Sequence, residues 1–354
     1  LKRLVSAYED YKRVRKKIDF TDMIDNFIKS GDGPNIDALF VDEAQDLSTL
    51  QWAMVSVLRE KPRIQVFTGD DDQAIMGFQG ADVEAFLNAT EKKTVLEQSY
   101  RVPRAVWQEA QNIVCRIEGR APKTWRPKDE DGVVQFHQNI WDVPLHEGEW
   151  CLMARTNRIA SQYAQALREE GLVYSRYGHP SIPAKTYEAL DDWEKWSKGE
   201  ALTPSKLRNV YTFMNMGEGY SRGSGPRSSA LQGLNQDAQI FMYEARDKMG
   251  LLLDGSVRWH KALGKIDLET KNYVLNALKR GDNVKNPRIK VSTIHSMKGG
   301  EADNILVVPD LSYAAHKEYQ TNPATEHRVY YVAVTRAKQA LHIMLPQTSR
   351  CYEI

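Results

Sequence analysis

The sequence predicts an α/β fold built on parallel sheets. Short apolar runs rich in β-branched residues alternate with longer helical patterns, and two of these runs end in clusters of acidic residues. The same alternation returns later in the chain after a long stretch with few strand signals. Such alternation is typical of parallel sheets covered by helices. We therefore expect two α/β units, with a helical insertion in the second.

The first predicted unit lies near the start of the chain. Strands are predicted at 38–41, 64–68 and 94–96, and a helical pattern over 49–60 separates the first two. Because consecutive parallel strands need a crossover connection, the helix between them fits a parallel pair.

The second predicted unit repeats this pattern in two separate parts of the chain. Its one clear helix is predicted over 158–170. The predicted strands are 150–154, 172–176, 288–293, 304–308 and 341–345. Because a long helical region separates these strands, the unit is expected to be interrupted by an insertion.

The insertion is predicted to be mostly helical, from about residue 180 to 286, with one flexible polar loop at 217–226. Trp193, Trp196 and Trp259 are candidates for DNA stacking, but their helical spacing favours a core position. The predicted boundaries are 1–95 for the first unit, 96–180 and 286–354 for the two parts of the second, and 181–285 for the insertion.

Composition limits the classes of partner. The 354 residues carry a net charge of only +1, so no general basic field favours nucleic acid. The run 12–17 is the one strongly basic stretch, and a solvated helix face is the commoner meaning of such a run. Any DNA contact must therefore come from local groups.

Cysteine usage and hydropathy limit the classes of site and the cellular compartment that the sequence allows. Cys115, Cys151 and Cys351 are far apart, which argues against a disulfide framework, a zinc ribbon or an iron–sulfur cluster. No apolar run approaches the roughly 20 residues that span a bilayer. We therefore expect a cytoplasmic protein without a membrane partner.

Two acidic clusters carry the chemistry. Asp42 and Glu43 follow the strand at 38–41, and the acidic run 70–72 follows the strand at 64–68. The carboxyl ends of parallel strands meet in one crevice, where ligands bind. There Asp42 is suited to Mg²⁺ held through its water shell, and Glu43 to orienting or deprotonating a water. A solvated turn is the alternative for this acidic pair alone.

The order of motifs resembles the superfamily 1 DNA helicases of the UvrD, Rep and PcrA type. The resemblance covers nearly the whole chain. It rests on 41–46 (Val-Asp-Glu-Ala-Gln-Asp, like a Walker B motif), 69–75 (Gly-Asp-Asp-Asp-Gln-Ala-Ile), 96–101 (Leu-Glu-Gln-Ser-Tyr-Arg), 293–301 (Thr-Ile-His-Ser-Met-Lys-Gly-Gly-Glu) and 332–338 (Val-Ala-Val-Thr-Arg-Ala-Lys), with 19–22 (Asp-Phe-Thr-Asp) preceding them.

This resemblance implies RecA-like sheets of the P-loop NTPase type and an ATP- and Mg²⁺-dependent motor on single-stranded DNA. By position, Asp42 would bind the metal, Glu43 would activate water and Gln73 would sense the γ-phosphate. Arg101 and Arg336 would reach the γ-phosphate from the second unit. Planar, permanently charged guanidinium groups are suited to that charge.

Further nucleotide contacts follow from the same resemblance. Tyr100 would stack on the adenine ring, although a core position for this aromatic is the alternative. Glu301 would accept a hydrogen bond from the ribose. The chain departs from the family at Gly300 and Ala302, where an apolar residue and an aromatic are usual, and this weakens the ribose assignment.

The resemblance also assigns DNA contacts. Phe78 replaces the usual tryptophan and retains a flat face for base stacking. Thr293 and His295 resemble positions that touch the DNA backbone, whereas Gln79 replaces a usual arginine. The implied substrates are single-stranded DNA and duplex junctions, translocation is expected from 3′ to 5′, and replication or repair proteins are possible partners.

One expected part is missing from the sequence. No Gly-x-x-x-x-Gly-Lys-Ser/Thr loop occurs, and the Gly264-Lys265 pair is no substitute because Ile266 follows it. We expect a fragment, truncated before its Walker A segment, rather than a degenerate remnant. A noncatalytic DNA-binding or partner-docking module is the alternative function. A helicase–nuclease fusion lacks a recognisable cysteine cluster or carboxylate–lysine tail after Arg336.

Overall fold

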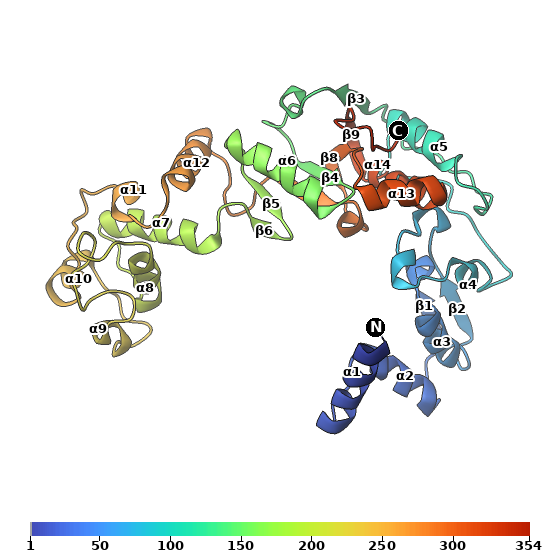
Figure 1. Ribbon diagram of the computed structural model, residues 1–354, viewed down its shortest axis with the longest axis horizontal. Helices are drawn as coiled ribbons and strands as arrows, with labels where there is room; N and C mark the ends of the chain where they lie inside the picture. The colour runs from blue at the N-terminus through green and yellow to red at the C-terminus, as the bar shows by residue number, and fades with distance from the viewer. Residues whose placement is uncertain (1) are drawn as a thin grey trace.

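The computed structural model describes residues 2–354, and these form three regions in a row (Figure 1). A small α/β unit lies at one end, a larger α/β unit lies in the middle, and a helical region lies at the other end. Each region has its own hydrophobic core, and the middle unit has one core on each face of its sheet. The prediction of an α/β fold with parallel sheets is confirmed.

The first unit contains a parallel two-stranded sheet. Strands β1 (Ala38–Val41) and β2 (Ile64–Phe67) pair in the register Ala38 to Ile64, and their crossover includes helix α3 (Thr49–Leu58). Trp52 of α3 and Leu39 of β1 share the small core. The other helices of the unit are α1 (Lys2–Arg15), α2 (Phe20–Ser30) and α4 (Val83–Leu87).

Lys12 belongs to the basic run singled out in the sequence, but its role here is structural. Its ammonium contacts Asp19 at 3.1 Å and Asp22 at 2.8 Å, and the residue is buried. Asp19 also caps α2, and Asp22 completes the capping box. These contacts tie α1 to α2, so this lysine is not available as a free DNA contact.

The predicted strand at 94–96 is wrong. This segment pairs with no strand in the described chain, and Leu96 is 85% exposed. A backbone bridge forms only further on, between Gln98 and Arg126. An apolar run becomes part of a sheet only where another strand lies beside it. The composition of 94–96 was therefore not enough to predict a strand.

The second unit is built on a seven-stranded sheet in the order β3-β9-β8-β4-β7-β5-β6. All neighbours are parallel except the short β5–β6 pair. The strands are β3 (Val133–His137), β4 (Trp150–Ala154), β5 (Tyr174–Arg176), β6 (His179–Pro180), β7 (Ile289–Thr293), β8 (Ala302–Val308) and β9 (Ala337–Met344). Strands β3 and β6 were not predicted from the sequence.

Helices cover both faces of this sheet. Alternate residues of each strand point to opposite faces. Thus Met153 joins the core beneath α5 (Arg104–Val114) and α14 (Pro323–Val334), whereas Leu152 joins the core beneath α6 (Asn157–Glu169). Helix α13 (Tyr313–Thr321) packs beside α14. Every residue of the central strand β4 is buried, as its continuous apolar run predicts.

The helices between Ala184 and Arg280 share a separate core. Trp193, Trp196 and Trp259 are buried in it, in agreement with the core interpretation. The helices are α7 (Ala184–Ser197), α8 (Pro204–Thr212), α9 (Ser229–Gln232), α10 (Met242–Lys248), α11 (Trp259–Ala262) and α12 (Leu268–Arg280).

The loop at 217–226 differs from its predicted flexible character. Tyr220 is buried and stacks on Tyr211, with ring centroids 5.4 Å apart. Gly225 has a φ of 114°, and a Cβ there would lie 2.6 Å from the Tyr220 ring. The glycines therefore allow the polar loop to pack tightly around one aromatic anchor.

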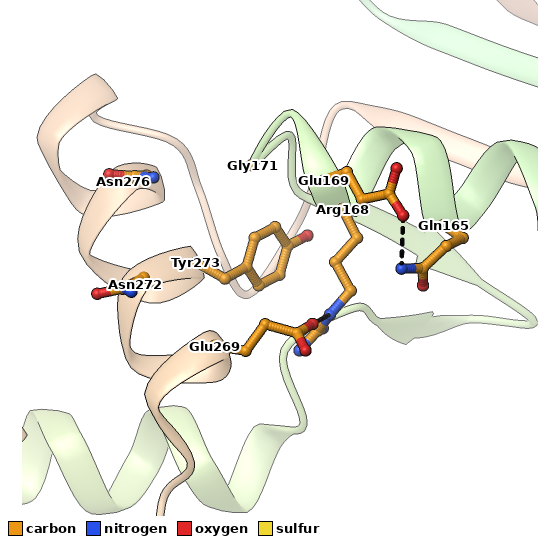
Figure 2. A pocket seen from close by; sticks show the side chains of 8 residues that line it. All are labelled: Gln165, Arg168, Glu169, Gly171, Glu269, Asn272, Tyr273 and Asn276. Carbon is orange, nitrogen blue, oxygen red and sulfur yellow. Dashed lines mark hydrogen bonds and ion pairs between the residues drawn. The ribbon is translucent and has the colours of Figure 1, made fainter.

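Helices α6 and α12 meet where the helical region joins the second unit (Figure 2). Arg168 of α6 lies over the Tyr273 ring at 4.7 Å and pairs with Glu269 at 3.1 Å, and both partners belong to α12. The Tyr273 hydroxyl donates a hydrogen bond to the Leu172 carbonyl. A cavity of about 310 Å³ lies beside these contacts. Within residues 2–354, no helix has both the length and the apolar character to cross a membrane.

Candidate nucleotide and DNA site between the two α/β units

The carboxyl edge of the first sheet positions the candidate metal ligand. Parallel pairing places Val41 opposite Phe67, so Asp42 and Thr68 leave the sheet side by side. The Thr68 hydroxyl donates to the Asp42 carboxylate at 2.5 Å, and the Glu43 amide donates to it at 2.9 Å. These two hydrogen bonds lower the pKa of Asp42. An exposed, ionised carboxylate with free oxygen lone pairs fits a Mg²⁺ ion that keeps much of its water shell.

Glu43 has an unusual backbone conformation. Its φ of 51° and ψ of 37° lie in the left-handed region, which a residue with a side chain seldom adopts. The side-chain amide of Gln45 donates to its carboxylate at 2.5 Å, and the residue is exposed. Strain of this kind gathers at functional sites. The conformation turns the chain sharply between β1 and the short helix that begins at Ala44.

Gln73 and Arg336 meet across the boundary between the units. The Arg336 guanidinium donates to the Gln73 side-chain oxygen at 2.7 Å, and its Nε donates to the Val332 carbonyl at 3.0 Å. Arg336 is 3% exposed. Burial and, to a smaller extent, the positive charge of Arg101 lower its pKa to about 10. Two cationic groups are therefore held close together, as the binding of a highly negative ligand requires.

Lys298 is a cross-unit residue that the sequence analysis did not assign. Its side chain is 8% exposed, and its ammonium pairs with Asp46 and donates to the Gln73 carbonyl at 2.8 Å. The same ammonium lies 3.7 Å from the Glu43 carboxylate. The lysine belongs to a quoted motif, but nothing in the local pattern identified its partners in the other unit. It ties the turn after β1 to the Gln73 segment.

Arg101 and Glu301 contact each other. The Arg101 Nε lies 2.9 Å from a Glu301 carboxylate oxygen, and the ammonium of Lys338 lies 3.9 Å from the other oxygen. The proposed phosphate and ribose ligands therefore pair with each other in this structure.

Tyr100 is 88% exposed, so the alternative of a core aromatic is wrong. It follows the bridge at Gln98 and directly precedes Arg101, which holds it near the charged pair. An exposed aromatic face next to cationic groups is suited to stacking with a planar base. Its role stays a prediction.

The candidate DNA contacts divide into two kinds. Phe78 is 72% exposed, and its ring and the His295 ring are arranged edge to face, with centroids 5.6 Å apart. Both line a cavity of about 660 Å³ between the units, together with Ala74, Ile75, Gly77, Arg155, Glu318, Asn322 and Thr325. Thr293 is buried, and its hydroxyl is hydrogen-bonded to Ser296 at 2.8 Å. Thr293 therefore orders the turn at His295 in this structure and does not face the cavity.

His295 is uncharged at neutral pH. Burial lowers its pKa to about 4, and the positive charge of Arg155 acts in the same direction. Arg155 forms a bidentate pair with Glu326, which is fully buried, with Nε–O and Nη2–O distances of 2.8 and 2.7 Å. The wall of the cavity thus combines the exposed ring of Phe78, the neutral imidazole of His295 and an arginine whose charge is neutralised by Glu326. Such a surface is suited to binding a base and its sugar.

The acidic run 70–72 is not arranged as a metal centre. In residues 2–354 it is the one group of three carboxylates close enough to share an ion. The ammonium of Lys123 contacts all three, at 2.6 Å for Asp70 and 3.1 Å for Asp72. A cation from the protein therefore occupies the position that a metal ion would take. No motif pointed to Lys123 in the sequence.

The sequence matches known domains in two stretches. Residues 1–94 match the UvrD/REP helicase N-terminal domain, and residues 173–348 match the UvrD-like helicase C-terminal domain. The two stretches contain all of the candidate residues except Tyr100 and Arg101. The first stretch covers the small α/β unit, and the second covers the helical region and the later strands of the second unit.

Curated relatives agree with these matches. DNA helicase II of Haemophilus influenzae is 25% identical over 269 residues, which cover 68% of this chain and 36% of that protein. The ATP-dependent DNA helicase PcrA of Bacillus subtilis is 26% identical over 48% of this chain and 25% of its own length. PcrA of Leuconostoc citreum is 28% identical over 49% and 27%. The chain thus spans little more than a third of the length of the Haemophilus influenzae protein and about a quarter of the length of these PcrA proteins.

Proposed function

The chain belongs to the UvrD/REP family of DNA helicases, and from this premise we propose that it works as an ATP-dependent translocase on single-stranded DNA. The observation that carries the proposal is the 2.7 Å contact between Arg336 of the second unit and Gln73 of the first. A guanidinium and a proposed phosphate sensor that meet where the two units join would bind the γ-phosphate together, and this would link nucleotide state to domain position.

The nucleotide is proposed to lie between the units, against groups from both. Asp42 would hold Mg²⁺, which supplies positive charge to the phosphates during transfer. Glu43 would orient and deprotonate the attacking water, since its exposed carboxylate stands at the same strand end. Arg101 would leave Glu301 for the γ-phosphate, because a phosphate carries more charge than the carboxylate that it replaces.

Adenosine recognition is proposed for Tyr100 and Glu301. The exposed ring of Tyr100 would stack on the base, and Glu301, released from Arg101, would accept a hydrogen bond from the ribose. The pairing of Arg101 with Glu301 before nucleotide binds keeps either charge from standing alone. ATP would thus exchange one set of ion pairs for another.

Single-stranded DNA is proposed to cross the cavity beside Phe78 and His295. The phenylalanine would stack on a base, a contact worth about 1–3 kcal/mol. Because the cavity walls come from both units, closure of the nucleotide cleft would change its shape and move the strand. Movement from 3′ to 5′ and action at duplex junctions, with replication or repair proteins as partners, are proposed from the family alone.

A noncatalytic DNA-binding module is the second candidate. It is favoured by the lack of a Gly-x-x-x-x-Gly-Lys-Ser/Thr loop in these 354 residues, because this loop supplies the backbone cradle and lysine for the phosphates. The convergence of Gln73, Arg336 and Lys298 on one boundary favours a working motor instead. The two candidates differ in whether this chain hydrolyses ATP.

The deciding experiment measures ATP hydrolysis by the 354-residue chain with and without single-stranded DNA. The Glu43→Gln variant removes the proposed base, and Glu91→Gln is the matched control because Glu91 is an exposed acid of the same unit. DNA-stimulated hydrolysis that is lost only in Glu43→Gln supports the motor. Binding of single-stranded DNA without any hydrolysis contradicts it for this chain and supports the noncatalytic module.

A further inference from the structure

The acidic run Asp70–Asp72 of the first unit is held by basic side chains of the second. Arg120 forms a bidentate pair with Asp72, with distances of 2.8 Å from Nε and 2.6 Å from Nη2. Lys123 contacts all three carboxylates, and the Ala121 amide donates to Asp71 at 2.9 Å. Both basic residues lie in the segment between α5 and β3. We name this set of contacts the acidic clasp.

Burial makes the acidic clasp costly to open. The Asp72 and Asp71 side chains are 0% and 4% exposed, and those of Lys123 and Arg120 are 14% and 21% exposed. Burial opposes the charge on Lys123, but the three carboxylates raise its pKa overall, and the same lysine and the Ala121 amide lower the pKa of Asp71. A charge that loses its partner in such surroundings is strongly destabilising.

The residues that follow the acidic run also belong to the second unit. Ile75 is 2% exposed and packs in the core beneath α5 and α14. Arg328 of α14 donates to the Asp71 carbonyl at 2.9 Å. Just before the run, by contrast, Gly69 still lies against the first unit, since a Cβ there would be 2.9 Å from the Phe86 ring. The change of partner falls at Asp70, whose amide donates to Gln45 of the first unit at 3.1 Å while its carboxylate pairs with Lys123 of the second.

Gln73 stands in the middle of this fastened segment. Its amide nitrogen donates to Asp70 at 2.8 Å, and its oxygen accepts from Arg336 at 2.7 Å. Because Asp70 is itself bound to Lys123, the acidic clasp fixes one end of the Gln73 side chain while Arg336 contacts the other. A movement of the acidic run would therefore carry Gln73 away from Arg336.

We propose that Arg120 and Lys123 are positioning residues of the nucleotide site, which fasten residues 70–75 to the second unit and so keep Gln73 beside Arg336. On this basis Gln73 moves with the second unit, although the sequence places it in the first. The nucleotide cleft then opens and closes between the strand end at Asp42 and a fixed Gln73–Arg336 pair. The catalytic part of this inference rests on the proposed function, whereas the fastening does not.

The test combines hydrogen exchange with kinetics on the 354-residue chain. The variants are Arg120→Gln and Lys123→Gln, with Arg120→Lys and Lys123→Arg as conservative partners. Arg104→Gln is the matched control, because it removes the same charge from a side chain that is 53% exposed and pairs only with exposed acids. Exchange of the amides at 70–76 is measured by mass spectrometry, with α14 and β4 as internal references for an intact fold.

In the Gln variants, we expect exchange at 70–76 to accelerate about tenfold or more, while α14 and β4 stay protected. For the hydrolysing enzyme, kcat should fall about 10- to 100-fold with little change in the KM for ATP. The reason is that ATP would still bind, but Gln73 would no longer be oriented beside Arg336. The conservative variants should recover most of both effects. Arg104→Gln should leave both unchanged.

Two results would overturn the inference. Unchanged exchange at 70–76 in both Gln variants would show that the acidic clasp does not fasten the segment. Accelerated exchange with unchanged kcat would show that fastening has no bearing on Gln73. If the unaltered chain hydrolyses no ATP, the proposed function fails for this chain, and the exchange results alone decide whether the acidic clasp fastens residues 70–75.

Discussion

The two α/β units differ in how they bury their strands. In the second unit every residue of β4 is buried between helix-covered faces. In the first unit the two-stranded sheet leaves Phe40 71% exposed and Ile64 55% exposed. Helices thus cover both faces of the sheet in the second unit, whereas part of the sheet in the first unit is exposed. The stability of the described chain should depend mainly on the second unit.

The candidate site follows the same division. Asp71 and Asp72, which pair with basic side chains of the second unit, are buried, whereas Asp42 and Glu43 at the strand end are exposed. One half of the site is therefore assembled by protein contacts alone. The other half consists of charged and aromatic side chains with surface left for a ligand. Changes in each half should have different consequences.

The largest effect is expected from Arg336→Ala, which breaks the contact that joins the halves. Loss of an arginine that stabilises phosphoryl transfer lowers kcat by about 10³-fold or more. Nucleotide binding should be largely kept, since Asp42 and Tyr100 are unaltered. Steady-state hydrolysis and a separate nucleotide-binding titration measure the two effects, with the exposed Arg350→Ala as control. Near-normal turnover would contradict the proposed role.

Core truncation tests the stability contrast directly. Leu341 of β9 is fully buried, so Leu341→Ala should lower the free energy of unfolding by about 2–5 kcal/mol. Phe40→Ala in the exposed face of β1 should change it by only about 0.5 kcal/mol. Urea unfolding followed by circular dichroism compares them. Equal losses would mean that the exposed face of the first sheet is buried in solution.

The pH dependence of stability tests the second unit further. Burial lowers the pKa of His295 and of His342 to about 4, and the neighbouring His137 also lowers that of His342. The unfolded chain binds these protons near pH 6.5, but the folded chain does not until about pH 4. Stability is therefore complete above pH 6.5 and is lost as the pH falls toward 4, by roughly 1–3 kcal/mol per histidine.

Substitution of single histidines tests which group causes the free energy of unfolding to fall with pH. His342→Gln should make the fall of the free energy of unfolding between pH 6.5 and 4 shallower, as measured by urea unfolding at several pH values. His146→Gln should not, because His146 is exposed. A slope unchanged in His342→Gln would assign the acid sensitivity to other groups.

The smallest effect is expected from Tyr100→Ala, at the exposed side of the site. Because Tyr100 is 88% exposed, its loss should leave the melting temperature unchanged. Loss of a stacking contact should weaken ATP binding by about 1 kcal/mol, and Tyr100→Phe should restore it. Isothermal titration of ATP measures this, with Tyr243→Ala of the helical region as control. Unchanged affinity in Tyr100→Ala would exclude adenine stacking.

Much of the fold was predictable because its signals are local. The runs at β1 and β4 are continuously apolar, and those at β2, β7 and β8 are rich in Ile and Val, so local composition identified these strands. The run at 94–96 has similar composition but no strand beside it. The short strand β3 was missed because its alternating, partly exposed pattern is weak and its partner β9 lies some 200 residues away in sequence.

The candidate site shows the same limit more sharply. The sequence by itself determined which side chains stand at strand ends and in which order the motifs occur, because these depend on neighbours along the chain. Only the tertiary structure decided that Lys298 bridges Asp46 and the Gln73 carbonyl, that Arg101 pairs with Glu301, and that Arg120 and Lys123 hold the acidic run. Each of these contacts joins groups far apart in sequence, and such pairing is set by how the units pack and not by any local pattern.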